Sequence, residues 1–131
     1  MNTKILMMSS ALFLGIIGIL LTFLPEEIAS YLNTKSNMVT VLFLKLLGAL
    51  YFGFGILNWT AKGTLIGGIY NRPIAIANLA HFGIGAITLV KVVSHIQNNS
   101  EIIIPLMAVY AIFGILFAIV FRTNPAKIEK Q

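Results

Sequence analysis

The sequence predicts an all-α fold: an integral membrane four-helix bundle with antiparallel up-down topology, in one domain spanning residues 1–131. Composition is the first observation behind this prediction, because 58% of the residues are hydrophobic and only 10% are charged. Soluble domains carry about 25% charged residues, so most of this surface must face lipid. The second observation is that the chain contains four apolar runs, each close to the roughly 20 residues that a membrane-spanning helix needs.

The four apolar runs predict spans at residues 5–24, 38–59, 74–93 and 102–121. The first ends at Pro25 and is longer than the core of a signal peptide, about 7–15 residues, so we expect it to be retained. The second contains one internal charge, Lys45. The third follows Arg72, and the fourth stops at Arg122 and carries Pro105 in its first turn, where proline is tolerated.

Lysine and arginine residues lie near the ends of the predicted spans and are unequally shared between the two sides. One side holds Lys4, Lys62, Arg72, Arg122, Lys127 and Lys130, and the other holds Lys35 and Lys91. Because the cytoplasmic side carries the excess of these residues, we predict cytoplasmic termini in a multi-pass protein of the inner (plasma) membrane. Basic residues at helix ends also argue against nucleic-acid binding, which needs them on one solvated face.

The connections between the spans differ in character. Residues 25–37 include Glu26 and Glu27 and predict a short amphipathic helical turn on the outer surface. Residues 62–72 are apolar enough to lie in the membrane interface. Residues 97–100 are polar and predict a tight turn, which would make the third and fourth helices antiparallel neighbours.

Small residues recur at helical spacing in three of the spans. They are Ala11, Gly15, Gly18 and Thr22 in the first, Gly48, Ala49, Gly53 and Gly55 in the second, and Ala111, Gly114 and Ala118 in the fourth. Inside a bilayer, small residues let helix backbones approach closely, so these stripes predict the seams between helices. We expect Gly15 and Gly53 to lie at such close contacts.

The third span carries a polar stripe instead. At 100° per residue, its members fall within an arc of about 100°; they are Asn78, His81, Gly85, Thr88 and His95. Polar groups that face lipid cost free energy. We therefore expect this stripe to face the bundle interior or a partner subunit.

Lys45 is the most unusual residue of the four spans. It lies about 10 Å below the outer end of its helix at 1.5 Å per residue, and about 5 Å from the bilayer centre. A lysine at the centre costs about 2.5–3.5 kcal/mol on insertion scales. Lys45 either forms a site for an anion, a lipid headgroup or a proton, or extends outward along its stem to meet Glu26 or Glu27.

His81 lies at a similar depth from the inner end, with Asn78 one turn before it. A histidine there could relay protons or hydrogen-bond a quinone or sterol oxygen, or it could be a structural histidine bonded to a neighbouring helix. Tyr51 lines the inner half of the second span. The candidate ligand-binding residues are therefore Lys45, Tyr51, Asn78, His81 and Thr88.

Several kinds of chemistry are excluded or disfavoured. The chain has no cysteine, which excludes disulfides, thiolate nucleophiles and cysteine-ligated metals. His81 and His95 lie about 21 Å apart along one helix, so they cannot share an ion, and we predict no metal and no other cofactor. We find no Ser-His-Asp set, no phosphate loop and no carboxylate pair in a cleft. The sequence therefore leans towards a protein that is not an enzyme.

Three short motifs resemble a known family. They are Leu24-Pro25-Glu26 after the first span, residues 46–55 (LLGALYFGFG) in the second, and Arg72-Pro73 before the third. This pattern resembles the small bacterial four-helix membrane proteins of the DoxX-like kind, which are largely uncharacterised. DoxX is associated with a quinone-linked sulfur-oxidising complex, so the resemblance implies a membrane subunit or a neighbour of quinone or lipid. It assigns no catalytic residue to this chain.

Three functions are consistent with these features. The first is a non-enzymatic membrane protein that binds a lipid-like or small organic molecule, or serves as a subunit of a membrane complex. The second is a small transporter or channel that uses Lys45 and the polar stripe of the third helix. The third is an oxidoreductase subunit that contacts quinone near His81. The expected partners are membrane lipids and either further copies of the chain or a larger membrane complex, with no nucleic acid.

Overall fold

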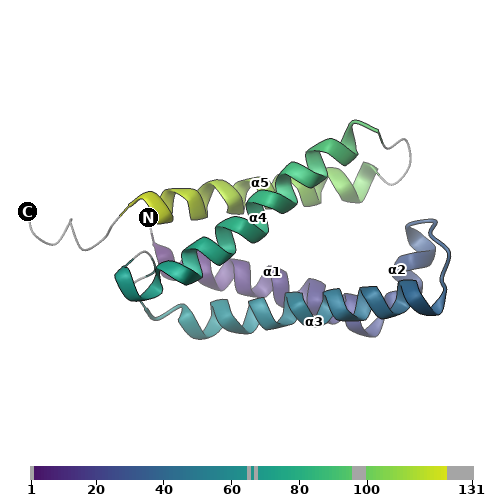
Figure 1. Ribbon diagram of the computed structural model, residues 1–131, viewed down its shortest axis with the longest axis horizontal. Coiled ribbons are helices and arrows are strands. Elements are labelled where there is room, and N and C mark those ends of the chain that lie inside the picture. The colour runs from purple at the N-terminus through teal and green to yellow at the C-terminus, as the bar shows by residue number, and fades with distance from the viewer. Residues whose placement is uncertain (1, 65, 67, 96–99, 124–131) are drawn as a thin grey trace, which may run out of the picture. The chain divides into compact units, whose positions relative to one another are not determined.

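A computed structural model of the chain is all-helical and describes residues 2–64, 66, 68–95 and 100–123 (Figure 1). The helices of the described residues are α1 (Thr3–Phe23), α2 (Pro25–Tyr31), α3 (Met38–Ala61), the 3-10 turn η1 (Ile69–Asn71), α4 (Arg72–Val93) and α5 (Ser100–Arg122). Of these, α1, α3, α4 and α5 are long and apolar enough to cross a membrane. The prediction of an all-α chain with four candidate membrane-spanning helices is confirmed.

Asparagine caps explain where two of the long helices begin. The Asn2 side chain accepts a hydrogen bond from the Lys4 N–H at 3.2 Å, and the Asn37 side chain accepts one from the Thr40 N–H at 2.8 Å. Such caps satisfy backbone donors that the first turn of a helix leaves unpaired. Pro73 then lies in the first turn of α4, where its missing N–H breaks no helical bond.

The chain divides into two compact units, Met1–Gly63 and Thr64–Gln131, and each is described by itself. In the first unit α1 packs along α3. The Asn58 side chain donates a hydrogen bond to the Ser10 hydroxyl at 3.0 Å, while Gly18 faces Gly48. The helices α1 and α3 therefore run in opposite directions.

Glycines form the seam between α1 and α3, but not all of the glycines that we expected. A Cβ atom on Gly18 would lie 2.6 Å from the Phe52 nitrogen, and one on Gly48 would lie 2.9 Å from the Gly18 oxygen. Both distances are too short for a real side chain, so only glycine permits this approach. The expectation is wrong for Gly53, and for Gly15 it holds for the backbone alone: a Cβ on Gly55 would lie 3.0 Å from the Gly15 nitrogen, but a Cβ on Gly15 itself or on Gly53 meets nothing within 4 Å.

The reason for this correction is the direction of the Cα–Cβ bond. Gly15 offers its backbone to Gly55, whose own Cβ would lie 3.0 Å from the Gly15 nitrogen, while the Cβ position of Gly15 points elsewhere. Gly53 and Ala49 lie on the exposed face of α3. Small-residue spacing therefore marked a seam on each of the two helices, while the rotation of each helix decided which residues meet.

In the second unit α4 packs along α5 through aromatic rings. Phe82 is fully buried, and its ring centroid lies 5.3 Å from Tyr110, 4.8 Å from Phe113 and 5.8 Å from Phe117. Gly114 also faces α4, but a Cβ there would lie at an ordinary 3.6 Å from Gly83. Ring packing rather than backbone contact therefore holds this pair.

The connections partly match their predictions. The helical turn expected within residues 25–37 is confirmed as α2, which is followed by Asn33 in the left-handed region, with φ of 54°. Between α3 and α4, Ile66 is buried and η1 leads directly into α4. The tight turn predicted at residues 97–100 lies, apart from the backbone of Ser100, outside the described residues, as do Lys127 and Lys130.

Candidate functional site

A hollow of about 520 Å³ opens in the first unit where α1 ends, α2 begins and α3 passes by. Its lining comprises Thr22, Phe23, Pro25, Glu26, Glu27 and Lys45. One non-helical residue, Leu24, separates α1 from α2: its N–H donates to the Leu20 oxygen at 2.9 Å, and its oxygen accepts from the Ile28 N–H at 3.1 Å. Leu24 leaves the helical conformation, with φ of −123° and ψ of 42°, and α2 then packs against α3.

Local chemistry explains why two carboxylates stand at this corner. Pro25 occupies the first turn of α2, followed by Glu26 and Glu27. Proline is pre-organised for a first helical turn, and the exposed N–H groups there favour negative side chains. Both glutamates are exposed and line the same hollow, so the expectation that no carboxylate pair lies in a cleft is wrong, and both carboxylates are available to a ligand.

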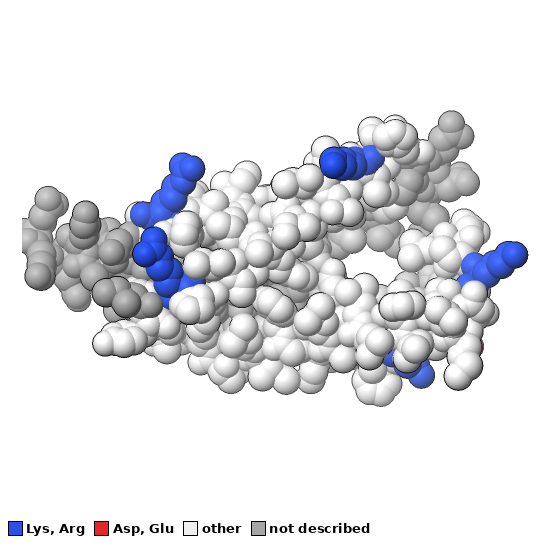
Figure 2. Space-filling view, viewed as in Figure 1, with Lys and Arg blue, Asp and Glu red and all other residues white. Residues whose placement is uncertain are grey.

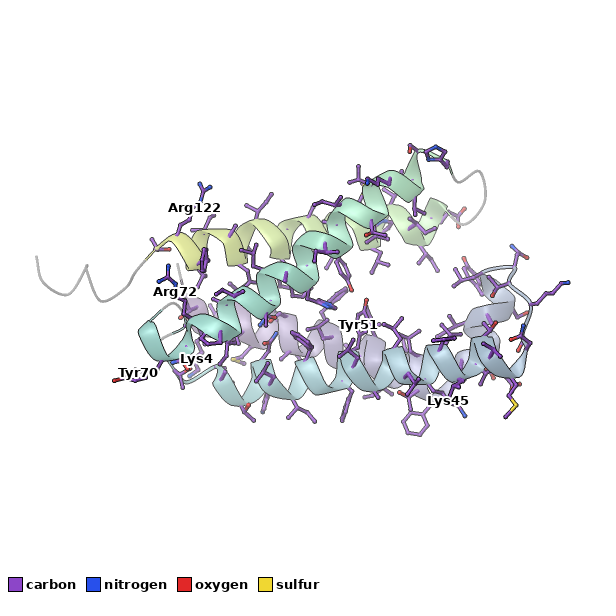
Figure 3. The ribbon with its side chains drawn as sticks, viewed as in Figure 1. Lys4, Lys45, Tyr51, Tyr70, Arg72 and Arg122 are labelled. Carbon is purple, nitrogen blue, oxygen red and sulfur yellow. The ribbon has the colours of Figure 1, made fainter. Side chains whose placement is uncertain are left out.

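Lys45 reaches the hollow from α3. It lies seven residues after Met38, the first residue of α3, which is about 10 Å along the helix. Its side chain is exposed, and Figure 3 places it in the half of α3 nearer α2. The structure thus brings together the lysine and the two glutamates that the sequence analysis associated.

The remaining walls of the hollow are apolar or already hydrogen-bonded. The Thr22 hydroxyl donates to the Gly18 oxygen of its own helix at 2.7 Å. Phe23 is 76% exposed at the end of α1. The charged groups of the hollow are therefore one ammonium and two carboxylates, beside an apolar wall.

A second group of candidate residues lies in the second unit, on α4. Asn78 is fully buried and donates to the Ile74 oxygen at 3.0 Å. One turn later, Nε2 of the half-buried His81 lies 3.3 Å from the Tyr110 hydroxyl of α5, within hydrogen-bond distance. The Tyr110 ring rests on Gly85, because a Cβ there would collide with its Cδ1 and Cε1 atoms. Glycine at this position lets the tyrosine reach the histidine.

Tyr110 is not among the candidate residues that the sequence analysis named. A usable signal was present: Tyr110 is the one polar residue within residues 102–121, and a polar stripe on one helix needs partners on its neighbour. Ser10 and Asn58 were missed in the same way, as a fully buried polar pair between α1 and α3.

The polar stripe divides along α4. Thr88 is exposed, and its hydroxyl donates to the Ile84 oxygen of its own helix at 2.9 Å. His95 lies beyond the end of α4 at Val93 and turns back, with Nδ1 2.9 Å from the Lys91 oxygen. The expectation of one face continuing to His95 is therefore wrong, because the helix ends first.

Tyr51 stands apart from the charged hollow. It is half-buried on α3 and is not among the residues that line the hollow (Figure 3). The five candidate residues thus fall into separate groups: Lys45 and Tyr51 in the first unit, and Asn78, His81 and Thr88 in the second. Comparison of the chain with protein-family models, curated proteins and solved structures finds no match.

Proposed function

We propose that the chain is a non-enzymatic, multi-pass protein of the plasma membrane that binds a membrane lipid in the hollow beside Lys45. One observation carries this proposal: an ammonium and two carboxylates border a single hollow at the end of two apolar helices long enough to span a membrane. Its volume of about 520 Å³ lies within the roughly 300–1,000 Å³ of small-molecule sites. The two other functions that the sequence suggested, quinone contact at His81 and transport along α4, remain predictions.

The depth of Lys45 supports a lipid headgroup as the occupant. About 10 Å inside α3, its flexible stem can bring the ammonium up to the headgroup region while the methylenes stay in the apolar layer. A bound phosphate would also offset part of the free energy that a charged residue costs inside the membrane. The hollow would stabilise the Lys45 ammonium in this way whether or not the protein also transports a solute.

We further propose up-down topology for the four spans, with both termini in the cytoplasm. In the first unit, Lys4 lies in the first turn of α1 and Lys62 directly follows α3, at the same end of the pair, where Asn58 bonds Ser10. In the second, Arg72 and Arg122 lie at the same end of the α4–α5 pair (Figure 3). Figure 2 shows blue side chains at the left of the view, where Figure 3 labels Arg72 of α4 and Arg122 of α5. A cytoplasmic excess of lysine and arginine supports this orientation.

Two of these basic residues lie over aromatic rings. The Lys62 ammonium lies 3.2 Å from the centre of the Trp59 ring, and the Arg72 guanidinium lies 5.0 Å from that of Phe121. Tryptophan and basic residues are typical of the membrane–water interface, and cation–π contact stabilises such pairs. These pairs support an interfacial position for the ends of α3 and α5.

Reporter fusions test the orientation. A fluorescent protein fused after Gln131 should fluoresce, because it folds in the cytoplasm, and alkaline phosphatase inserted after Lys35 should be active, because it folds outside. The exchanged fusions, phosphatase after Gln131 and the fluorescent protein after Lys35, serve as controls and should both be silent. An active phosphatase at the C-terminus would reverse the proposed orientation.

Lipid retention tests the binding function. The purified full chain should carry phospholipid through detergent exchange, and Lys45→Met should lower the retained amount about tenfold, the effect of losing one charge-assisted hydrogen bond of about 1.4 kcal/mol. Lys35→Met, which removes an exposed lysine from the connection before α3, is the matched control and should retain the wild-type amount. Equal phospholipid content in wild type and Lys45→Met, measured by native mass spectrometry, would contradict the proposed function.

A further inference from the structure

The charge pattern of the hollow selects among phospholipids. We propose that its ligand is a phospholipid with a zwitterionic headgroup of phosphate and primary ammonium, the chemistry of phosphatidylethanolamine. The phosphate binds Lys45, and the ammonium binds between Glu26 and Glu27. This inference rests on the proposed function, in which the hollow holds a lipid.

The three charged groups exclude headgroups of a single sign. Lys45 supplies a cation that pairs with phosphate through charge-assisted hydrogen bonds. Glu26 and Glu27 line the same hollow, so an anionic headgroup without an amine would place its charge beside two carboxylates. Like charges brought together at a binding site disfavour the partner that carries them. A headgroup with both charges satisfies all three residues.

The carboxylates further favour a primary ammonium over a quaternary one. A primary ammonium has three N–H donors, and each ionised carboxylate only accepts. A quaternary ammonium has no N–H and is held instead by several aromatic faces. Phe23 is the one aromatic residue among those lining the hollow, so choline would lose its usual contacts while the carboxylates lost their hydrogen bonds.

The order of the charges along the membrane normal identifies a lipid rather than a soluble zwitterion as the occupant. Lys45 lies within the span of α3, whereas Glu26 and Glu27 belong to α2, which follows the end of α1. A phospholipid presents its parts in the same order: acyl chains, then phosphate, then amine. The exposed ring of Phe23 at the end of α1 provides an apolar surface on the acyl-chain side.

Native mass spectrometry of the full chain in detergent tests this selectivity. The chain is titrated with phosphatidylethanolamine, phosphatidylcholine and phosphatidylglycerol that share the same acyl chains. We expect wild type to bind phosphatidylethanolamine about tenfold more tightly than the other two, the effect of one charge-assisted hydrogen bond gained or lost. Lys45→Met should lose affinity for every phosphate-bearing lipid, because the phosphate contact is common to all three.

The two glutamates separate this inference from the proposed function. Glu26→Gln combined with Glu27→Gln keeps the side-chain shapes, so it should lower phosphatidylethanolamine affinity about tenfold and raise phosphatidylglycerol affinity. Glu101→Gln, an exposed glutamate on α5, is the matched control and should leave both unchanged. An unchanged melting temperature of each variant in detergent shows that binding, and not folding, is compared.

Three results would overturn the inference. If the three lipids bind wild type equally and Lys45→Met weakens all of them, the lipid-binding function stands and the headgroup assignment fails. If no lipid binds, both fail together. If free O-phosphoethanolamine displaces the lipid at equal concentration, the occupant is a soluble zwitterion. Preferential binding of phosphatidylethanolamine that depends on both glutamates and on Lys45 supports the assignment.

Discussion

Replacing Gly18 with leucine is expected to push α1 away from α3 and to lower the free energy of unfolding by about 3 kcal/mol. Even a Cβ atom at this position would lie 2.6 Å from the Phe52 nitrogen and 2.9 Å from the Gly48 oxygen. Both atoms belong to the backbone, so no side-chain rotation can relieve the overlap. Gly18→Ala should already be destabilising, and titration of the folded chain with sodium dodecyl sulfate in mixed micelles measures the change.

Gly53→Leu is the matched control for this prediction. It adds the same side chain to α3, but the Cβ position of Gly53 meets nothing within 4 Å and lies on the exposed face. We expect its free energy of unfolding to stay within about 0.5 kcal/mol of wild type. Equal destabilisation by Gly18→Leu and Gly53→Leu would show that the α1–α3 seam does not run through Gly18.

Phe82→Ala should be the most damaging truncation in the second unit. Phe82 is fully buried against Tyr110, Phe113 and Phe117, and aromatic pairs contribute about 0.5–1.5 kcal/mol each beyond buried area. In a soluble core such a change costs about 3–5 kcal/mol. Lipid solvates apolar groups as well as a protein interior does, so only the packing and cavity losses remain, and we expect about 2 kcal/mol.

Two further variants on α4 serve as controls for the destabilisation expected of Phe82→Ala. Ile84→Ala removes a side chain that is 67% exposed, so it should leave the free energy of unfolding nearly unchanged. Phe82→Leu keeps most of the volume but loses the ring contacts, so it should fall between wild type and Phe82→Ala. Denaturation in the same mixed micelles compares the three, and a loss for Ile84→Ala as large as that for Phe82→Ala would place the α4–α5 contact on a different face of α4.

The arrangement of elements along the chain could be predicted from the sequence because its causes are local. The length of each apolar run determines a candidate span. Pro25, with Glu26 and Glu27 behind it, indicates a new helix start at α2. The caps at Asn2 and Asn37 act within three residues of their own positions. Even the association of Lys45 with the two glutamates followed from distance along one helix and the length of a lysine side chain.

The contacts between helices could not be predicted in the same way. Small-residue spacing marked Gly15 and Gly53 as readily as Gly18 and Gly48, yet an added Cβ would collide with the backbone of the other helix only in the second pair. Nor does the spacing along α4 and α5 predict that the Tyr110 hydroxyl lies 3.3 Å from Nε2 of His81.

The sequence by itself therefore determined that most of the surface faces lipid, where the four candidate spans lie, and that a short helix connects the first two. The tertiary structure decided which glycines form the seam, that Tyr110 reaches His81 over Gly85, and that Lys45 and the two glutamates border one hollow. The physical reason is that the spacing of residues determines which of them share a face of a helix, but it does not determine which face turns toward the neighbouring helix. Only the shape of the neighbouring helix selects the rotation at which backbones approach and polar groups find partners.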